Sequence, residues 1–153
     1  MTIKCIAIGN IIMGDDGIGI KVAEHLSSHL EKENIEVILA ETDVDYALSK
    51  VENGNFIFII DSTYLGVSPG TITLTSIRDP NAGQHHMYSQ HQPSLINLLK
   101  TYRKSVEGFV IGIEIEEIDF KLELSHTLNA KLLQICEEVD ELIFNIIRGK
   151  KNA

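Results

Sequence analysis

The chain has 153 residues, a length that fits one domain with a substantial buried core. Its acidic residues outnumber the basic ones by 22 to 13, and the formal net charge is -9 at pH 7. This charge argues against a nucleic-acid partner, because binding to a phosphate backbone depends on lysine and arginine. The N-terminal residues lack the long apolar core of a signal peptide, and no apolar run is long enough to span a membrane, so we expect a cytoplasmic protein.

The first half of the chain alternates strand patterns with helix patterns. Short continuous apolar runs are typical of parallel strands buried on both faces, and apolar residues at helical spacing predict amphipathic helices between them. The predicted elements are, in chain order, a strand over Ile3–Ile8, a helix with Ile18, Val22, Leu26 and Leu30 on one face, a strand over Ile35–Ala40, a short helix over Asp45–Val51, and a strand over Asn55–Ile60 that ends at Asp61.

The second half adds an edge strand, a further strand and two helices. After a Pro-Gly turn, threonines alternate with apolar residues over 71–77, which predicts a half-exposed edge strand. Pro93 suits the first position of a helix through Tyr102, Gly108–Ile115 forms the last strand, and a long amphipathic helix runs from Thr127 to Arg148. We therefore predict one domain over 1–153, a three-layer αβα sandwich with a mostly parallel, mixed sheet of about five strands and a polar tail from about residue 149.

The two cysteines, Cys5 and Cys136, stand in an apolar strand pattern and in an amphipathic helix pattern. No metal or redox spacing surrounds them, so we expect two buried, reduced thiols. Neither lies at a strand-to-helix turn, and the loop "GDDGIG" lacks the serine of a nucleophile elbow. The sequence therefore does not predict a serine or cysteine hydrolase.

Two adjacent acids stand in the glycine-rich loop "GNIIMGDDGIG" between the first strand and the first helix. Such a loop often binds phosphate through backbone N–H groups, but the carboxylates of Asp15 and Asp16 would repel an anion, and a Walker lysine is absent. A nucleotide-binding domain is therefore disfavoured. An acid at this place also caps the free N–H groups of the helix. We assign capping to Asp15 and expect Asp16 to point outward as a ligand, with the reverse order as the alternative.

Asp61 stands at the end of another predicted parallel strand. Ligands bind at the carboxyl ends of such strands, and right-handed crossovers favour the first and third strands as neighbours. Asp16 and Asp61 are then expected to approach each other from different loops, and two carboxylates without a basic partner favour a cation. The alternative is that Asp61 caps a turn, because Ser62 and Thr63 follow it.

Most of the histidines are interpreted as structural or solvated. His25 and His29 are four residues apart in the first helix, a spacing that can chelate a metal, but they lie beside the apolar stripe of an ordinary surface helix. His85 and His86 are expected in a solvated loop, and His126 in the cap region of the last helix.

His91 is different, because it stands directly before the Pro93 helix in "QHQPSL" and is expected to be held rigidly. One imidazole with two carboxylates is a common ligand set for a borderline divalent metal, with positions left open for water or substrate. Spacing alone carries little weight, because dispersed Asp and His residues also occur in many domains that bind nothing.

The ordered motifs "IGNIIMGDDGIG", "FIIDSTYLGVSPGTI", "SQHQPSLINLL" and "VIGIEIEEIDF" resemble those of the hydrogenase maturation proteases. These endopeptidases trim the C-terminal extension of a nickel-iron hydrogenase large subunit, and the resemblance runs from Met1 to about Arg148. It implies that Asp16, Asp61 and His91 are the catalytic and metal-binding residues. It also implies that they bind nickel already inserted into the substrate precursor, and it implies no nucleotide or organic cofactor. The alternative is a non-cleaving, metal-dependent module that docks on the nickel-loaded subunit.

The chain departs from the family at two places. Many members have Glu where this chain has Asp16, so the carboxylate here is one methylene shorter. After the second strand the family commonly has an Asp-Gly-Gly turn, whereas this chain has "AETDVD" over Ala40–Asp45. Without these glycines the backbone adopts positive φ less freely. This turn lies on the rim of the predicted crevice, so the departure bears on substrate choice, and Glu41 or Asp43 is expected to take over its polar role.

Overall fold

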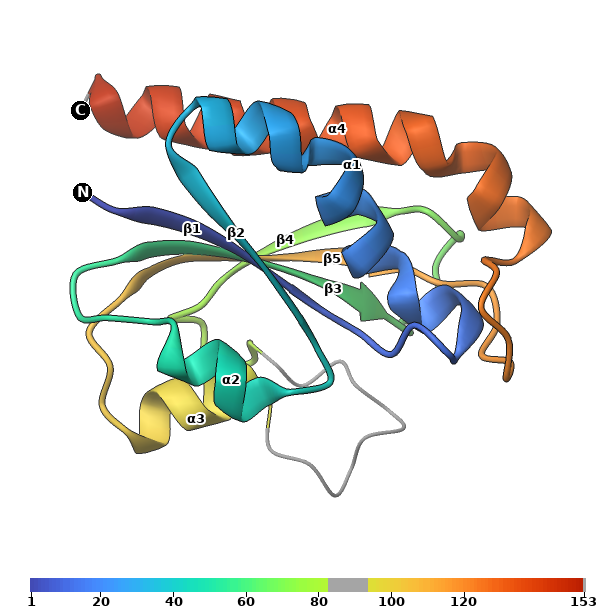
Figure 1. Cartoon of the computed structure of the whole chain (residues 1–153), viewed down its shortest axis with the longest axis horizontal. Helices are drawn as coiled ribbons and strands as arrows, with labels where there is room; N and C mark the ends of the chain where they lie inside the picture. The colour runs from blue at the N-terminus through green and yellow to red at the C-terminus, as the bar shows by residue number, and fades with distance from the viewer. Residues whose placement is uncertain (83–93, 153) are drawn as a thin grey trace.

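A computed structural model describes residues 1–82 and 94–152 of the chain. In these residues the strands and helices follow one another along the chain in the predicted order (Figure 1). They are β1 (Ile3–Ile8), a 3-10 turn η1 (Gly14–Gly17), α1 (Ile18–Lys32), β2 (Ile35–Glu41), α2 (Val44–Ser49), β3 (Phe56–Thr63), β4 (Ile72–Ser76), α3 (Leu95–Thr101), β5 (Glu107–Glu114) and α4 (His126–Lys151).

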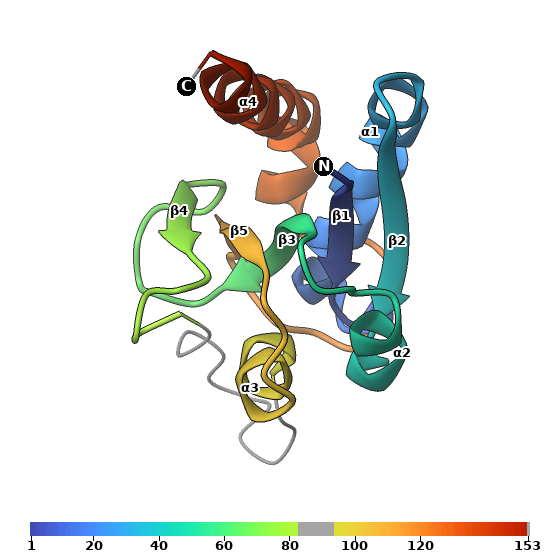
Figure 2. The ribbon, with the colours of Figure 1, turned by 90° about the vertical axis from the view of Figure 1, so that its left-hand side faces the viewer.

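The described strands form one mixed sheet in the order β2-β1-β3-β5-β4. The pairs β1–β2, β1–β3 and β3–β5 are parallel, and β4 runs antiparallel to β5 at the edge. Helices α1 and α4 cover one face of the sheet, and α2 and α3 cover the other (Figure 2). The predicted three-layer sandwich, its mostly parallel, mixed sheet and its edge strand are therefore confirmed.

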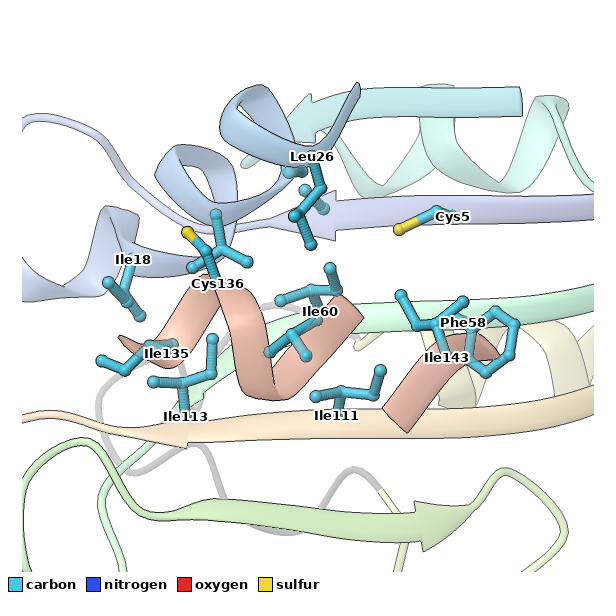
Figure 3. Close-up of a cluster of buried hydrophobic side chains, with 14 of the residues drawn as sticks. Cys5, Ile18, Leu26, Phe58, Ile60, Ile111, Ile113, Ile135, Cys136 and Ile143 are labelled. Carbon is cyan, nitrogen blue, oxygen red and sulfur yellow. The ribbon is translucent and has the colours of Figure 1, made fainter. Parts of the chain in front are cut away.

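The buried apolar side chains of the described residues form two clusters, and the larger fills the space between the sheet and the pair α1 and α4 (Figure 3). The predicted apolar face of α1 is buried there, and every residue of β3 is buried. Burying a large apolar side chain contributes about 1.5–3 kcal/mol, so this cluster is a main source of stability. Both cysteines lie in it as free thiols, as predicted, and burial raises the pKa of Cys5 to about 12.

Several element ends differ from the prediction. β3 continues past Asp61 to Thr63, and α4 continues to Lys151, three residues beyond the predicted helix end at Arg148. The ammonium of Lys150 bonds Glu107 at 3.0 Å and lies over the ring of Phe56, and these contacts extend the helix. The predicted helix start at Pro93 lies outside the described residues. None of the helices in the described parts of the chain is both long and apolar enough to cross a bilayer.

Candidate active site

The loops that follow β1, β3 and β5 lie at the same edge of the sheet, on the right of Figure 1. The loop after β1 folds tightly, because Gly9 has a φ of 150° and a Cβ on it would lie 2.3 Å from the carbonyl oxygen of Asp16. Gly19 lets α1 approach equally closely, since a Cβ there would lie 2.7 Å from the carbonyl oxygen of Ile60. The glycines therefore hold Asp16 against the end of β3.

The carboxylate of Asp16 is buried and has two defined hydrogen-bond donors. Its Oδ2 accepts the N–H of Asn10 at 2.8 Å, and its Oδ1 accepts the hydroxyl of Ser62 at 2.6 Å. The N–H of Ser62 donates to Oδ1 of Asp61 at 2.8 Å. Ser62 thus connects the two acids that the sequence places on different loops. Because a carboxylate oxygen has two lone pairs, each Asp16 oxygen keeps one for a further ligand.

The third predicted ligand, His91, lies outside the described residues, as do His85 and His86. Within 1–82 and 94–152 there is no group of three His, Cys, Asp or Glu side chains that could hold a metal ion. The described residues show that Asp16 and Asp61 both bond Ser62, and the three-residue metal site stays a prediction. Carboxylate oxygens with one imidazole nitrogen are a donor set that suits borderline divalent metals such as nickel.

The expectation that Asp15 caps the first helix is wrong. The N-cap residue of α1 is Gly17, and the buried carboxylate of Asp15 points instead to the loop between β5 and α4. Its Oδ1 accepts the N–H of Ser125 at 2.6 Å, and its Oδ2 accepts the N–H groups of Glu116 at 3.1 Å and Glu117 at 3.2 Å. Asp15 therefore holds one wall of the candidate site in place.

Glu114 is a second buried carboxylate with this kind of role, and the sequence reasoning missed it. It stands at the end of β5 and accepts the hydroxyl of Thr63 at 2.7 Å. It also accepts the backbone N–H groups of Leu65, Gly66 and Val67 in the loop after β3. The only signal in the sequence was an acid at the end of an apolar strand, as for Asp61.

A backbone hydrogen bond connects the end of β2 to the loop after β1, beside the candidate site. The carbonyl of Glu41 accepts the N–H of Gly9 at 2.9 Å, and Glu41 adopts a φ of 56° although it is not glycine. A left-handed conformation costs a residue with a side chain about 1 kcal/mol or more. Asp43 instead caps α2 by accepting the N–H of Tyr46 at 2.9 Å. Of the two acids expected to replace the polar turn, only Glu41 has its side chain left for the rim.

Among the described histidines, His29 makes contacts between two helices. His29 lies 2.8 Å from a carboxylate oxygen of Asp140, and its ring lies 4.7 Å from that of Phe144, so it connects α1 to α4. This agrees with its structural interpretation. His126 is the first residue of α4, but the cap is the side chain of Ser125, which accepts the N–H of Leu128 at 3.2 Å.

Comparison with known proteins identifies the family. The hydrogenase maturation protease family matches residues 20–141. A putative hydrogenase maturation protease of Methanocaldococcus jannaschii is 26% identical over 95% of this chain and 96% of its own length. The structure is similar to the [NiFe] hydrogenase maturation protease HybD from Thermococcus kodakarensis, with a TM-score of 0.70, 26% identity, and 93% of this chain and 99% of that chain covered.

The hydrogenase maturating endopeptidase HybD from E. coli has the same fold, with a TM-score of 0.74, 23% identity, and 91% of this chain and 90% of that chain covered. The α/β sandwich of this chain is thus the fold of a class of peptidases. The chain belongs to the hydrogenase maturation protease family, and it is a peptidase.

Proposed function

We propose that this peptidase removes the C-terminal extension from the nickel-loaded large-subunit precursor of a [NiFe]-hydrogenase. It recognises the inserted nickel through Asp16, Asp61 and His91. Nickel arrives with the precursor and is part of the substrate. We expect the reaction to need no nucleotide or organic cofactor. The reaction takes place in the cytoplasm, which agrees with two buried free thiols, since cytosolic proteins keep their cysteines reduced.

The observation that carries this proposal is the connection of Asp16 to Asp61 through Ser62. Asp16, in the turn after β1, and Asp61, near the end of β3, both bond Ser62 at the end of the sheet where ligands of open α/β sheets bind. Hydrogen bonds to Asp16 fix the orientation of its carboxylate, as the outer-shell partners of metal ligands do in known metal sites. Asp16 is one methylene shorter than the glutamate of many relatives, so its carboxylate can move less to reach a metal. Hydrogen bonds that fix its orientation are therefore more important for Asp16.

These residues act in the proposed reaction mainly by positioning. The two carboxylates and the imidazole bind the nickel of the precursor, and the peptide bond next to that nickel is thereby held in the crevice. Holding a reacting bond in place removes much of the entropic barrier to its hydrolysis. Precursor without nickel lacks the anchoring group, so it is not held and is not cut.

Intact-mass spectrometry of the precursor tests the proposal. The large-subunit precursor from the organism that encodes this chain is prepared with and without nickel and incubated with the purified protein. We expect only the nickel-loaded precursor to lose the mass of its C-terminal extension. An unchanged mass of the nickel-loaded precursor, or equal cleavage of both forms, would contradict the proposal. A binding module would retain the precursor without changing its mass.

Variants of the candidate site separate its members. Asp61→Asn is expected to slow cleavage of the nickel-loaded precursor at least about 100-fold. Ser62→Ala is expected to slow it about 10-fold, because outer-shell partners typically contribute 10–100-fold to metal affinity or activity. Glu31→Gln, at an exposed acid near the end of α1, is the control and should cleave at the wild-type rate. Wild-type cleavage by Asp61→Asn would remove Asp61 from the site.

A further inference from the structure

The loop between β5 and α4 exposes an unusual combination of side chains. Over residues 116–123, which we call the docking loop, Phe120 is 77% exposed and Leu122 is 61% exposed. The same segment has four acidic residues and one lysine, and all four acids are exposed. The lysine, Lys121, forms an ion pair with Glu117 at 3.1 Å. The surface of this loop is therefore both apolar and acidic.

The docking loop is held in one conformation by bonds at both ends and in the middle. Asp15 accepts the N–H groups of Glu116 and Glu117 at one end and of Ser125 beyond the other. In the middle, the N–H of Gly14 donates to the carbonyl of Lys121 at 2.8 Å. The loop thus keeps its two apolar side chains in water although its backbone is fixed to the buried part of the molecule. A fixed loop loses little conformational entropy when a partner covers it.

The position of the docking loop relates it to the candidate active site. It is bonded to Gly14 and Asp15, and the next residue, Asp16, is bonded through Ser62 to the end of β3. Met13 pairs with Lys121 in a short parallel bridge, which places the exposed Ile12 beside the loop. The apolar and acidic surface is therefore continuous with the edge of the sheet where Asp16 lies.

We propose that the docking loop, with Ile12, binds the hydrogenase large-subunit precursor through a basic segment that carries apolar side chains. This inference rests on the proposed function. A peptidase that acts on a protein must have part of that protein lying against the surface next to its catalytic residues, and this loop is such a surface. Its acids select a partner of opposite charge, and Phe120 and Leu122 supply the apolar contact area that gives affinity at an interface.

Truncation of the apolar pair is the first test. The variant Phe120→Ser with Leu122→Ser is assayed on nickel-loaded precursor, with cleavage followed by intact mass. We expect KM to rise about tenfold or more with kcat within about twofold of wild type, since central apolar contacts of interfaces each contribute more than about 1 kcal/mol. Both side chains are exposed, so the urea midpoint of the variant should equal that of wild type. Leu133→Ser, at a leucine of α4 that is 67% exposed, is the matched control and should leave KM unchanged.

Neutralising the acids is the second test. In the variant Glu116→Gln with Glu123→Gln, KM should be higher than in wild type at low salt and should depend less on salt concentration, because exposed charges act mainly by screened long-range attraction. Glu31→Gln serves again as the control for an exposed acid elsewhere. A wild-type KM with wild-type salt dependence would contradict the basic character of the partner segment.

The outcomes also separate this inference from the proposed function. If the wild-type protein cleaves the precursor and the serine variant has the wild-type KM, the docking loop is overturned and the proposed function stands. If the wild-type protein binds the precursor without cleaving it, the proposed function fails, and the dissociation constant then replaces KM with the same tenfold criterion. If the wild-type protein neither binds nor cleaves the precursor, both fail.

Discussion

Asp15 and Asp16 are neighbours in the sequence, yet their carboxylates point to different parts of the molecule. Asp15 accepts bonds from the loop after β5, and Asp16 accepts bonds from Asn10 and Ser62. The cause is the 3-10 turn η1, in which successive residues are rotated by about 120° around the helix axis. Two adjacent acids can therefore bond different segments of the chain, one as an anchor of the loop after β5 and one as a candidate ligand.

Replacement of Asp15 tests the anchoring role. Asp15→Ala leaves three buried or partly buried N–H groups without their acceptor, so we expect the free energy of unfolding to fall by about 3 kcal/mol or more, measured by urea denaturation. Asp43→Ala is the comparison, because Asp43 is a simple helix cap on α2 and its loss should cost about 1 kcal/mol. Equal losses in the two variants would show that Asp15 contributes no more than a cap.

At the scale of the elements, periodicity predicted which segments are strands and helices but not where they end. β3 extends past Asp61 because Ser62 and Thr63 pair with Ile113 and Glu114 of β5, a partner far along the chain. The last helix extends to Lys151 because its end contacts β5 and β3. Apolar spacing reports the buried face of a segment, whereas its ends depend on tertiary contacts that local sequence does not contain.

The end of α4 gives a prediction with a defined pH dependence. The hydrogen bond from Lys150, followed by its charge and that of Arg78, lowers the pKa of Glu107 below the ordinary value of 4.5. A lowered carboxyl pKa contributes stability above the unfolded pKa and loses it as the pH falls through the folded pKa. Lys150→Met should therefore lower the urea midpoint at pH 7, and the difference from wild type should shrink at a pH well below 4.5, where only the contact of Lys150 with the ring of Phe56 remains.

The adjacent Lys151 supplies the control for this prediction. Lys151→Met removes the same charge from the same turn of α4, but the bond to Glu107 and the contact with the ring of Phe56 belong to Lys150. The control should keep nearly the wild-type midpoint at both pH values. A loss of stability that is equal in the two variants would instead indicate a general effect of charge at the end of the helix.

At the scale of the whole molecule, the fold could be predicted because right-handed crossovers and buried parallel strands leave few arrangements for this order of elements. The same reasoning brought Asp16 and Asp61 to one edge of the sheet. The anchoring roles of Asp15 and Glu114 could not be predicted, because all the bonds to Asp15 and most of those to Glu114 come from backbone N–H groups in other loops. One of these bonds joins residues 101 positions apart, and a backbone N–H group carries no residue-specific signal.

The two thiols test whether the sheet and its covering helix unfold together. Cys5 lies on β1 and Cys136 on α4, within one hydrophobic cluster. Burial raises the pKa of Cys5 to about 12, and burial followed by the charge of Glu137 raises the pKa of Cys136 to about 11. At pH 8 the folded protein therefore has almost no reactive thiolate, and alkylation requires an opening that exposes the cysteine.

We expect both thiols to react with iodoacetamide at the same slow rate in native conditions, and this rate should rise with urea as steeply as the equilibrium constant for global unfolding. In the variants Cys5→Ala and Cys136→Ala only one thiol remains, so mass spectrometry assigns each alkylation rate to one cysteine. Each rate is compared with the unfolding free energy measured for the same variant.

α4 buries Ile135, Val139 and Ile143 against the sheet, so its separation from the strands would expose most of the cluster and should cost nearly the full free energy of unfolding. If Cys136 reacts much faster than Cys5, with little dependence on urea, then α4 separates from the sheet on its own. The docking loop leads directly into α4. Its conformation would then be lost whenever α4 separates, even while the rest of the protein stays folded.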